Sequence, residues 1–329
     1  MHYNFCTLFD SNYLTRGIAM YNSLNRVCSN FTLYIFAFDD RVHDILKERN
    51  LKNAVIISLK EFEDAELLKV KPTRSVAEYC WTSTSSTVLY VLENFDADNC
   101  TYIDADLYFY SSPAPLFEEM GDKSILLTEH RYSPQYNKEV KSGKYCVQFV
   151  TFKKDEKGLK ALRWWRERCL EWCYAYYKDG KFGDQLYLDD WTTRFEGVHE
   201  LQHQGGGLAA WNVQQYEFTK AADEFTGKVS ATGEKFDVIF YHFHYLRFFR
   251  NGEVELGRRT LTDQVLSYFY KPYIRELLEL KDEISKKYPG FDPNGAGMKP
   301  SGLKASLITV YRKINKVYNI FEINKFLSR

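Results

Sequence analysis

Long apolar runs are missing from this 329-residue chain. No stretch reaches the roughly 18 consecutive apolar residues of a membrane-spanning helix, so we expect no transmembrane segment. The first residues, Met1-His2-Tyr3-Asn4, lack a basic region and precede only a short apolar run. We therefore also expect no signal peptide.

Excess charge of either sign is missing too, because 44 Lys and Arg balance 44 Asp and Glu. The chain as a whole thus has no electrostatic footprint for nucleic acid. Its seven cysteines are scattered and contain no Cys-x-x-Cys pair. An odd number in apolar surroundings favours reduced thiols in a cytoplasmic protein.

Several catalytic motifs are also absent. The chain has no G-x-S-x-G elbow, Walker loop, zinc cluster or G-x-G-x-x-G fingerprint. Serine hydrolase, P-loop and classical dinucleotide-binding chemistry therefore have no support in the sequence.

The N-terminal part of the chain contains a pattern of alternating strands and helices. Apolar runs at 3–9, 31–38 and 54–58 predict strands, and residues 13–24 and 42–49 between them predict helices. The β-α-β-α-β order predicts an α/β fold with a mixed, mainly parallel sheet flanked by helices.

The rest of the chain continues this fold and adds a C-terminal helical extension. We divide it into a domain at 1–255 and an extension at 256–329. A hydroxyl-rich stretch at 82–87 either faces a ligand or packs against the sheet. Further strands are predicted at 124–127, 145–152 and 236–240, helices at 75–94, 155–177, 184–191 and 261–287, and a basic amphipathic segment at 303–329.

Two carboxylates lie between apolar strands at Asp104-Ala105-Asp106. Side chains at i and i+2 of an extended segment share a face, unless the backbone turns at Ala105. Neighbouring carboxylates repel, and a divalent cation such as Mg²⁺ or Mn²⁺ relieves this repulsion. The alternative is an ordinary Asp-x-Asp turn at a strand end.

A histidine pair, His242 and His244, follows a late apolar strand, and either imidazole could complete a metal site. Both could equally be ordinary surface or core residues.

Two further polar groups lie near predicted strand or helix ends. Asp10-Ser11-Asn12-Tyr13 either holds a base by stacking and hydrogen bonds or caps a helix. Asp184 and Gln185 either contact sugar hydroxyls or start a helix.

The order of these motifs resembles nucleotide-sugar glycosyltransferases of the GT-A fold. The group in question contains glycogenin and the bacterial lipopolysaccharide galactosyl- and glucosyltransferases. Tyr102-Ile103-Asp104-Ala105-Asp106 is the most specific match, and the likeness spans roughly residues 3–250. It implies a retaining, metal-dependent transfer of a sugar from a nucleotide diphosphate, with UDP expected, to a hydroxyl of a glycan or lipid-linked acceptor in bacterial surface polysaccharide synthesis.

The resemblance also implies roles for single residues. Asp184 and Gln185 would be catalytic and would contact the donor sugar together with Cys146 and Gln148. Mn²⁺ or Mg²⁺ would bind Asp104, Asp106 and His242, with His244 as the alternative, and the nucleotide would bind Asp10, Asn12, Tyr13 and Asp104.

The chain departs from the family pattern at two places. Tyr245 stands where the family's His-x-x-Gly motif has glycine, and Cys146 and Gln148 replace an Asn-x-Gly. Because of these departures, one alternative is that the protein binds a nucleotide sugar without catalysing its transfer. A sugar nucleotidyltransferase is a further alternative, although residues 10–16 lack the glycine-rich basic loop it would need.

The C-terminal segment 297–329 carries seven cations against one acid. A basic amphipathic helix suits peripheral contact with the inner face of an anionic membrane. Packing on the domain with a solvated basic face is the alternative.

Overall fold

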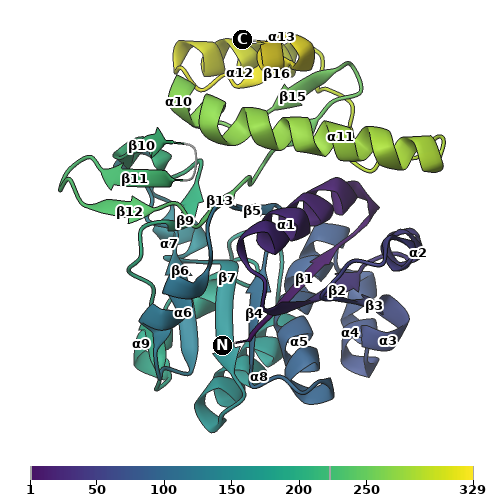
Figure 1. The fold of residues 1–329 in the computed structure, drawn as a ribbon, viewed down its shortest axis with the longest axis vertical. Helices are drawn as coiled ribbons and strands as arrows, with labels where there is room; N and C mark the ends of the chain where they lie inside the picture. The colour runs from purple at the N-terminus through teal and green to yellow at the C-terminus, as the bar shows by residue number, and fades with distance from the viewer. Residues whose placement is uncertain (1, 222–223, 329) are drawn as a thin grey trace.

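The computed structural model describes residues 2–221 and 224–328. A central sheet has helices on both faces, and the C-terminal part of the chain forms a further layer across one end (Figure 1). The fold is mixed α/β, as the alternation of strands and helices predicts.

Seven strands form the central sheet: β1 (Tyr3–Phe9), β2 (Phe31–Ala37), β3 (Ala54–Ser58), β4 (Asn99–Ile103), β6 (Ile125–Glu129), β7 (Tyr145–Lys153) and β8 (Val198–Glu200). Their order is β3-β2-β1-β4-β7-β6-β8. The pairs β1/β2, β1/β4, β2/β3 and β6/β8 are parallel, whereas β7 is antiparallel to both neighbours. The prediction of a mainly parallel sheet is confirmed.

Alternating side chains of the strands pack into two apolar clusters, one on each face of the sheet. In β1, Phe5 and Phe9 join one cluster, whereas Cys6 and Leu8 join the other, as the period of two in a strand requires. The first cluster is covered by α1 (Leu14–Val27), α2 (Asp40–Arg49) and α6 (Ala114–Met120). The second is covered by α3 (Leu59–Phe62), α4 (Ala65–Val70), α5 (Val76–Asn94) and α8 (Glu156–Glu171).

Helix α5 carries the hydroxyl-rich stretch. It begins with a capping box in which Ser75 and Glu78 bind each other's backbone N–H groups. Residues 82–87 are all buried, and α5 packs against α8, β1 and β4. Thr82 Oγ1 donates to the Glu78 carbonyl at 2.8 Å. Of the two alternatives, packing against the sheet is the one the structure shows.

Two predicted helices end differently in the structure. Helix α8 stops at Glu171 and not at residue 177, because Trp172 adopts an extended backbone (φ −154°, ψ 120°). The predicted helix at 184–191 is wrong: it is a turn, a 3-10 helix at Leu186–Leu188 and a short α9 (Trp191–Arg194). Gly183 turns the chain there with φ +53°.

A second sheet, in the order β5-β13-β9, carries part of the candidate site. Its strands are β5 (Leu107–Phe109), β9 (Gly206–Ala209) and β13 (Phe240–His242), and a third sheet contains β10 (Tyr216–Lys220), β11 (Phe225–Val229) and β12 (Lys235–Asp237). The single strand predicted at 236–240 is therefore wrong. Val238 N–H bonds to β11, whereas the Ile239 carbonyl accepts from Tyr110 after β5. The chain thus passes from one sheet to the other between these two residues.

The C-terminal extension contains α10 (Asp263–Val265), a π-helical turn (Leu266–Tyr270), α11 (Lys271–Lys287), α12 (Leu303–Ile314) and α13 (Ile323–Ser328). Strands β14 (Arg247–Phe248), β15 (Glu253–Glu255) and β16 (Ile320–Glu322) form an antiparallel sheet.

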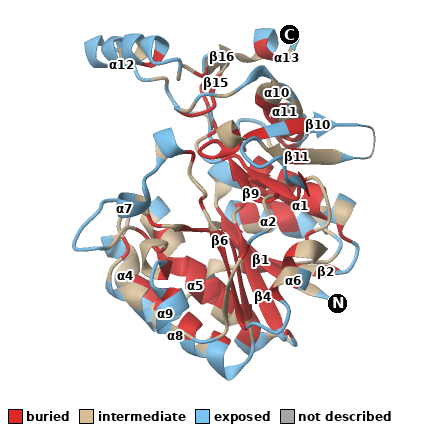
Figure 2. Cartoon of the chain, turned by 90° about the vertical axis from the view of Figure 1, so that its left-hand side faces the viewer, coloured by how far each residue is buried: buried red, intermediate tan, exposed pale blue. Residues whose placement is uncertain are grey.

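The continuous amphipathic segment predicted at 303–329 is therefore wrong beyond residue 314. Strand β16 pairs with β15, and Phe326 is buried against Phe321 at 4.7 Å between ring centroids. Helix α12 instead projects from the body and is largely exposed (Figure 2). Within 2–221 and 224–328, no helix is both long and apolar enough to cross a membrane.

Candidate active site

Backbone hydrogen bonds position the two aspartates and the histidine. Asp104 follows β4 directly, and its N–H donates to the Gln148 carbonyl of β7 at 3.1 Å. The chain then turns through Asp106, whose carbonyl accepts from the Phe243 N–H at 3.0 Å. His242 ends β13, which pairs with β5. The backbone therefore turns at Ala105, the exception to an extended segment that the sequence left open, and the three side chains come together.

Asp104, Asp106 and His242 form a compact cluster. His242 Nε2 lies 3.1 Å from Asp106 Oδ1 and 3.5 Å from Asp104 Oδ2, and one ligand atom from each residue lies within 4.8 Å of the others. Asp106 and His242 are buried, whereas the Asp104 side chain keeps 29% exposure. His244 is exposed and lies outside the cluster. Of the two predicted histidines, His242 is therefore the one that the fold brings to the carboxylates.

Gln148 determines how His242 is oriented. Its Oε1 lies 2.7 Å from His242 Nδ1 and can only accept, so Nδ1 carries a hydrogen and Nε2 is the ring nitrogen that faces the carboxylates. Trp211 packs edge-on against the imidazole at 5.4 Å and, together with Cys146, forms a small apolar cluster beside it. Burial raises the pKa of the Cys146 thiol. A Cβ on Gly207 would meet Gln148 Nε2 at 3.3 Å, so glycine leaves room for this arrangement.

The charges of the cluster are mutually dependent. Burial, with the charge of Asp106, raises the pKa of Asp104 to about 6, although His242 opposes this. Burial also acts to raise the pKa of Asp106, but the charge and hydrogen bond of His242 outweigh it and lower that pKa. Burial would lower the pKa of His242, yet the two carboxylates raise it well above 6.5. A cation at Nε2 would therefore compete with a proton for the same position.

The donor set fits a hard divalent cation. Carboxylate oxygens with one neutral imidazole suit Mn²⁺ and Mg²⁺. The hydrogen bond that leaves a histidine lone pair free is the usual companion of a metal-ligating imidazole.

Asp184 and Gln185 lie in the turn that replaces the predicted helix. Burial, with the charge of Asp104, raises the pKa of Asp184 to about 7, so this carboxyl lies within electrostatic reach of the cluster. The Asp184 carbonyl accepts from Trp165 Nε1 at 2.9 Å. Gln185 donates its amide to the Ser142 carbonyl in α7 (Glu139–Ser142).

The predicted nucleotide-binding residues lie at the start of α1. Asp10 accepts from the backbone and side-chain amides of Asn12, both at 3.0 Å, so the two side chains hold each other. Tyr13 keeps 39% exposure, and the Arg16 guanidinium lies 4.6 Å from its ring centroid. Burial and the charge of Asp106 raise the pKa of Tyr13 to about 12. Tyr13 is therefore close to the cluster while its ring remains accessible.

Other residues surround the cluster: Tyr245, which the sequence marks as a departure from the family pattern, and Arg247 and Trp211, which sequence reasoning missed. Tyr245, at the position of the family's glycine, adopts a left-handed backbone with φ +71°, which L side chains rarely do. The chain thus keeps the turn without the glycine. Arg247 lies 4.2 Å from the Tyr245 ring centroid. The Gly205-Gly206-Gly207 run, which precedes Trp211 in the sequence, allows close approach to other segments, since a Cβ on Gly205 would clash with the Asp237 carbonyl and one on Gly207 would crowd Thr128 and Gln148.

No family model matches the chain. It is 30% identical over 295 residues to the uncharacterised Bacillus subtilis protein YfnD, covering 88% of this chain and 93% of YfnD. It is 31% identical over 297 residues to the uncharacterised YfnF of the same organism, covering 87% and 96%.

Among solved structures, the chain is similar to the galactosyltransferase LgtC in complex with donor and acceptor sugar analogues. The TM-score is 0.51 at 11% identity, covering 84% of this chain and 95% of LgtC. At this identity the likeness establishes the fold, which is GT-A.

Proposed function

We propose a function from one premise: the chain belongs to the family of the Bacillus subtilis proteins YfnD and YfnF, and its fold is GT-A. The function is metal-dependent transfer of a sugar from a nucleotide diphosphate, with UDP expected, to a hydroxyl of a glycan or lipid-linked acceptor. The convergence of Asp104, Asp106 and His242 is the observation that carries it. These three side chains lie at the end of a strand of an α/β sheet, which is where ligands such as this donor bind in such sheets.

The chain's own residues would hold Mn²⁺ or Mg²⁺ through the two carboxylates and His242 Nε2. When bound, the cation supplies positive charge against the negative charge of the departing diphosphate. Gln148 holds the imidazole in the required tautomer. Asp104, partly exposed, would also contact the ribose.

The remaining predicted residues surround this centre. Tyr13 would stack on the base, with Asp10 and Asn12 at its edge. Asp184 would contact donor-sugar hydroxyls, and its raised pKa allows the carboxyl to donate or accept a hydrogen bond near neutral pH. Gln185 lies next to it. Cys146 and Gln148 would line the sugar from β7.

We further propose that the protein works in the cytoplasm, in surface polysaccharide synthesis, with α12 touching the inner face of the membrane. Its exposed apolar side chains include Leu303 and Leu307, at 87% and 71% exposure, beside Lys304 and Lys313. Co-sedimentation with anionic liposomes tests this contact. Equal binding after Leu303→Asp with Leu307→Asp would remove the membrane role.

The metal-dependent donor site is tested by calorimetric titration of UDP with and without Mn²⁺, followed by a donor-hydrolysis assay. Binding should require the metal and disappear in the double variant Asp104→Ala with Asp106→Ala. Asp122→Asn, an exposed acid in the turn after α6, is the matched control and should bind as the wild type does.

Two outcomes would change the proposal. Equal UDP binding without metal would contradict the role of the cluster. Metal-dependent binding without any turnover would favour the non-catalytic binding protein that the departures at Cys146, Gln148 and Tyr245 leave open.

A further inference from the structure

A cavity of about 360 Å³ lies between the GT-A domain and the C-terminal extension. Its lining comes from the start of α1, from β14 with the segment that follows it, and from the residues before and within α12. Tyr13 is part of the lining and connects the cavity to the metal-site cluster, since the pKa of Tyr13 responds to Asp104 and Asp106. The cavity therefore adjoins the proposed donor site but extends away from it toward α12.

Two arginines, Arg247 and Arg258, line this cavity. Within 2–221 and 224–328, Arg247 and Arg258 form no ion pair, and their guanidinium groups lie 4.2 and 5.7 Å from the ring centroid of Tyr245. Both side chains are exposed. Two like charges beside one ring repel each other, and a phosphate group accepts hydrogen bonds from both.

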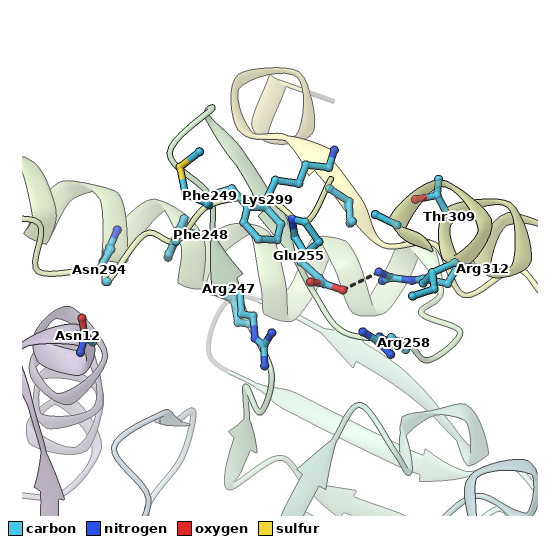
Figure 3. Close-up of a pocket in the computed structure, with 18 of the residues that line it drawn as sticks. Asn12, Arg247, Phe248, Phe249, Glu255, Arg258, Asn294, Lys299, Thr309 and Arg312 are labelled. Atoms are coloured by element: carbon cyan, nitrogen blue, oxygen red, sulfur yellow. Dashed lines mark hydrogen bonds and ion pairs between the residues drawn. The ribbon is translucent and has the colours of Figure 1, made fainter. Parts of the chain in front are cut away.

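The other cations of the lining are already neutralised or bonded. Lys299 pairs with Glu253 at 2.6 Å. Arg312 pairs with the buried Glu255 at 2.6 Å, as Figure 3 shows. Arg16 donates to three backbone carbonyls. The attraction for an anion is thus concentrated at Arg247 and Arg258.

Another part of the lining is apolar and comes from α12 and a residue before the helix. Met298, Ala305 and Ile308 contribute to this apolar part. In α12, which is described throughout, Arg312 is the one buried side chain, so an apolar surface continues from Ile308 outward to residues such as Tyr311, exposed at 64%. A ligand with an anionic head and a hydrocarbon chain complements both parts of the lining.

We infer that this cavity binds a lipid whose head group is a phosphate or diphosphate ester, with the phosphate at Arg247 and Arg258 and the chain along α12. This names the acceptor as lipid-linked, and that part rests on the proposed function. Tyr13 lines this cavity and belongs to the proposed donor site, so a head group bound there would lie next to the donor. Binding of the lipid itself needs no metal.

Calorimetric titration with dodecyl phosphate, kept monomeric, tests the inference, with inorganic phosphate and dodecyl maltoside as partial ligands. Dodecyl phosphate should bind much more tightly than either. Arg258→Gln should weaken it about tenfold, because a charge-assisted hydrogen bond is lost. Ile308→Asp, at the cavity wall, should weaken it by a similar factor.

Matched controls separate the cavity from general surface contact. Leu307→Asp and Lys304→Gln alter neighbouring α12 residues outside the cavity lining and should change dodecyl phosphate binding less than twofold. Mn²⁺-dependent UDP binding should be unchanged in all four variants, which keeps a failure here distinct from a failure of the donor site.

Three results would overturn the inference. Dodecyl phosphate could bind no better than inorganic phosphate. Leu307→Asp could weaken binding as much as Ile308→Asp, which would indicate contact of the exposed helix face only. Arg258→Gln could weaken UDP binding in the same proportion, which would assign the arginines to the donor diphosphate.

Discussion

Replacing Gln148 with methionine should weaken Mn²⁺ binding while leaving the fold intact. The side chain is fully buried and its Oε1 lies 2.7 Å from His242 Nδ1. Methionine has a similar volume and no strong acceptor, so the imidazole is free to take the other tautomer or to rotate. His242 Nε2 would then no longer be held toward Asp104 and Asp106.

The expected loss is about 10- to 100-fold in metal affinity, the range for a partner that orients a ligating histidine. This corresponds to about 1.4–2.7 kcal/mol. The effect on the free energy of unfolding should be smaller. Leaving Nδ1 without an acceptor costs about 1–3 kcal/mol, but Gln148 Nε2 is itself buried without a partner in the described structure, and its removal offsets part of that cost.

Free Mn²⁺ measured by electron paramagnetic resonance, in the presence of UDP, gives the affinity directly. Gln148→Glu keeps an acceptor for Nδ1–H and should retain most of the binding. Gln202→Met, at an exposed position, is the matched control. Metal affinity of Gln148→Met within twofold of the wild type would refute the reasoning.

Two other changes test the same region through stability. The pKa of Asp184 is about 7 in the folded protein, above its value in the unfolded chain. The wild type therefore loses unfolding free energy as the pH rises from the unfolded pKa to the folded one. Asp184→Asn removes that loss, and its gain in unfolding free energy should grow by about 2–3 kcal/mol between about pH 5 and pH 8. Gly207→Ala should lower the free energy of unfolding by about 2–4 kcal/mol and weaken Mn²⁺ binding, because φ of Gly207 is +132° and a Cβ there would meet Thr128 Cγ2 at 2.9 Å.

Urea denaturation measures both effects, each against its own control. Asp190→Asn, an exposed acid paired with Arg194, should show no pH-dependent gain of this size. Gly233→Ala has φ +77° but open space around it, so it isolates backbone strain at about 1–2 kcal/mol. An effect of Asp184→Asn on unfolding free energy that does not change with pH would contradict the first argument. Equal losses of unfolding free energy in Gly207→Ala and Gly233→Ala would contradict the second.

The fold class could be predicted because the relevant information is local. Alternation of apolar and polar residues marks strands, and the order of strands and helices at 3–58 is enough for a mainly parallel sheet. The errors lie where tertiary contacts override local pattern. The segment at 184–191 has helical composition, yet it is held as a turn in which Trp165 bonds to the Asp184 carbonyl.

The sequence by itself determined the pair of aspartates at a strand end and the existence of a histidine pair after a late strand. Only the tertiary structure decided that His242 and not His244 reaches them, because β13 pairs with β5 and ends at His242, and the chain turns away at Phe243, whose N–H bonds to the Asp106 carbonyl. It also decided that Gln148 orients the imidazole and that residues 320–328 fold back onto β15. These outcomes depend on contacts between residues far apart in the chain, which no local periodicity encodes.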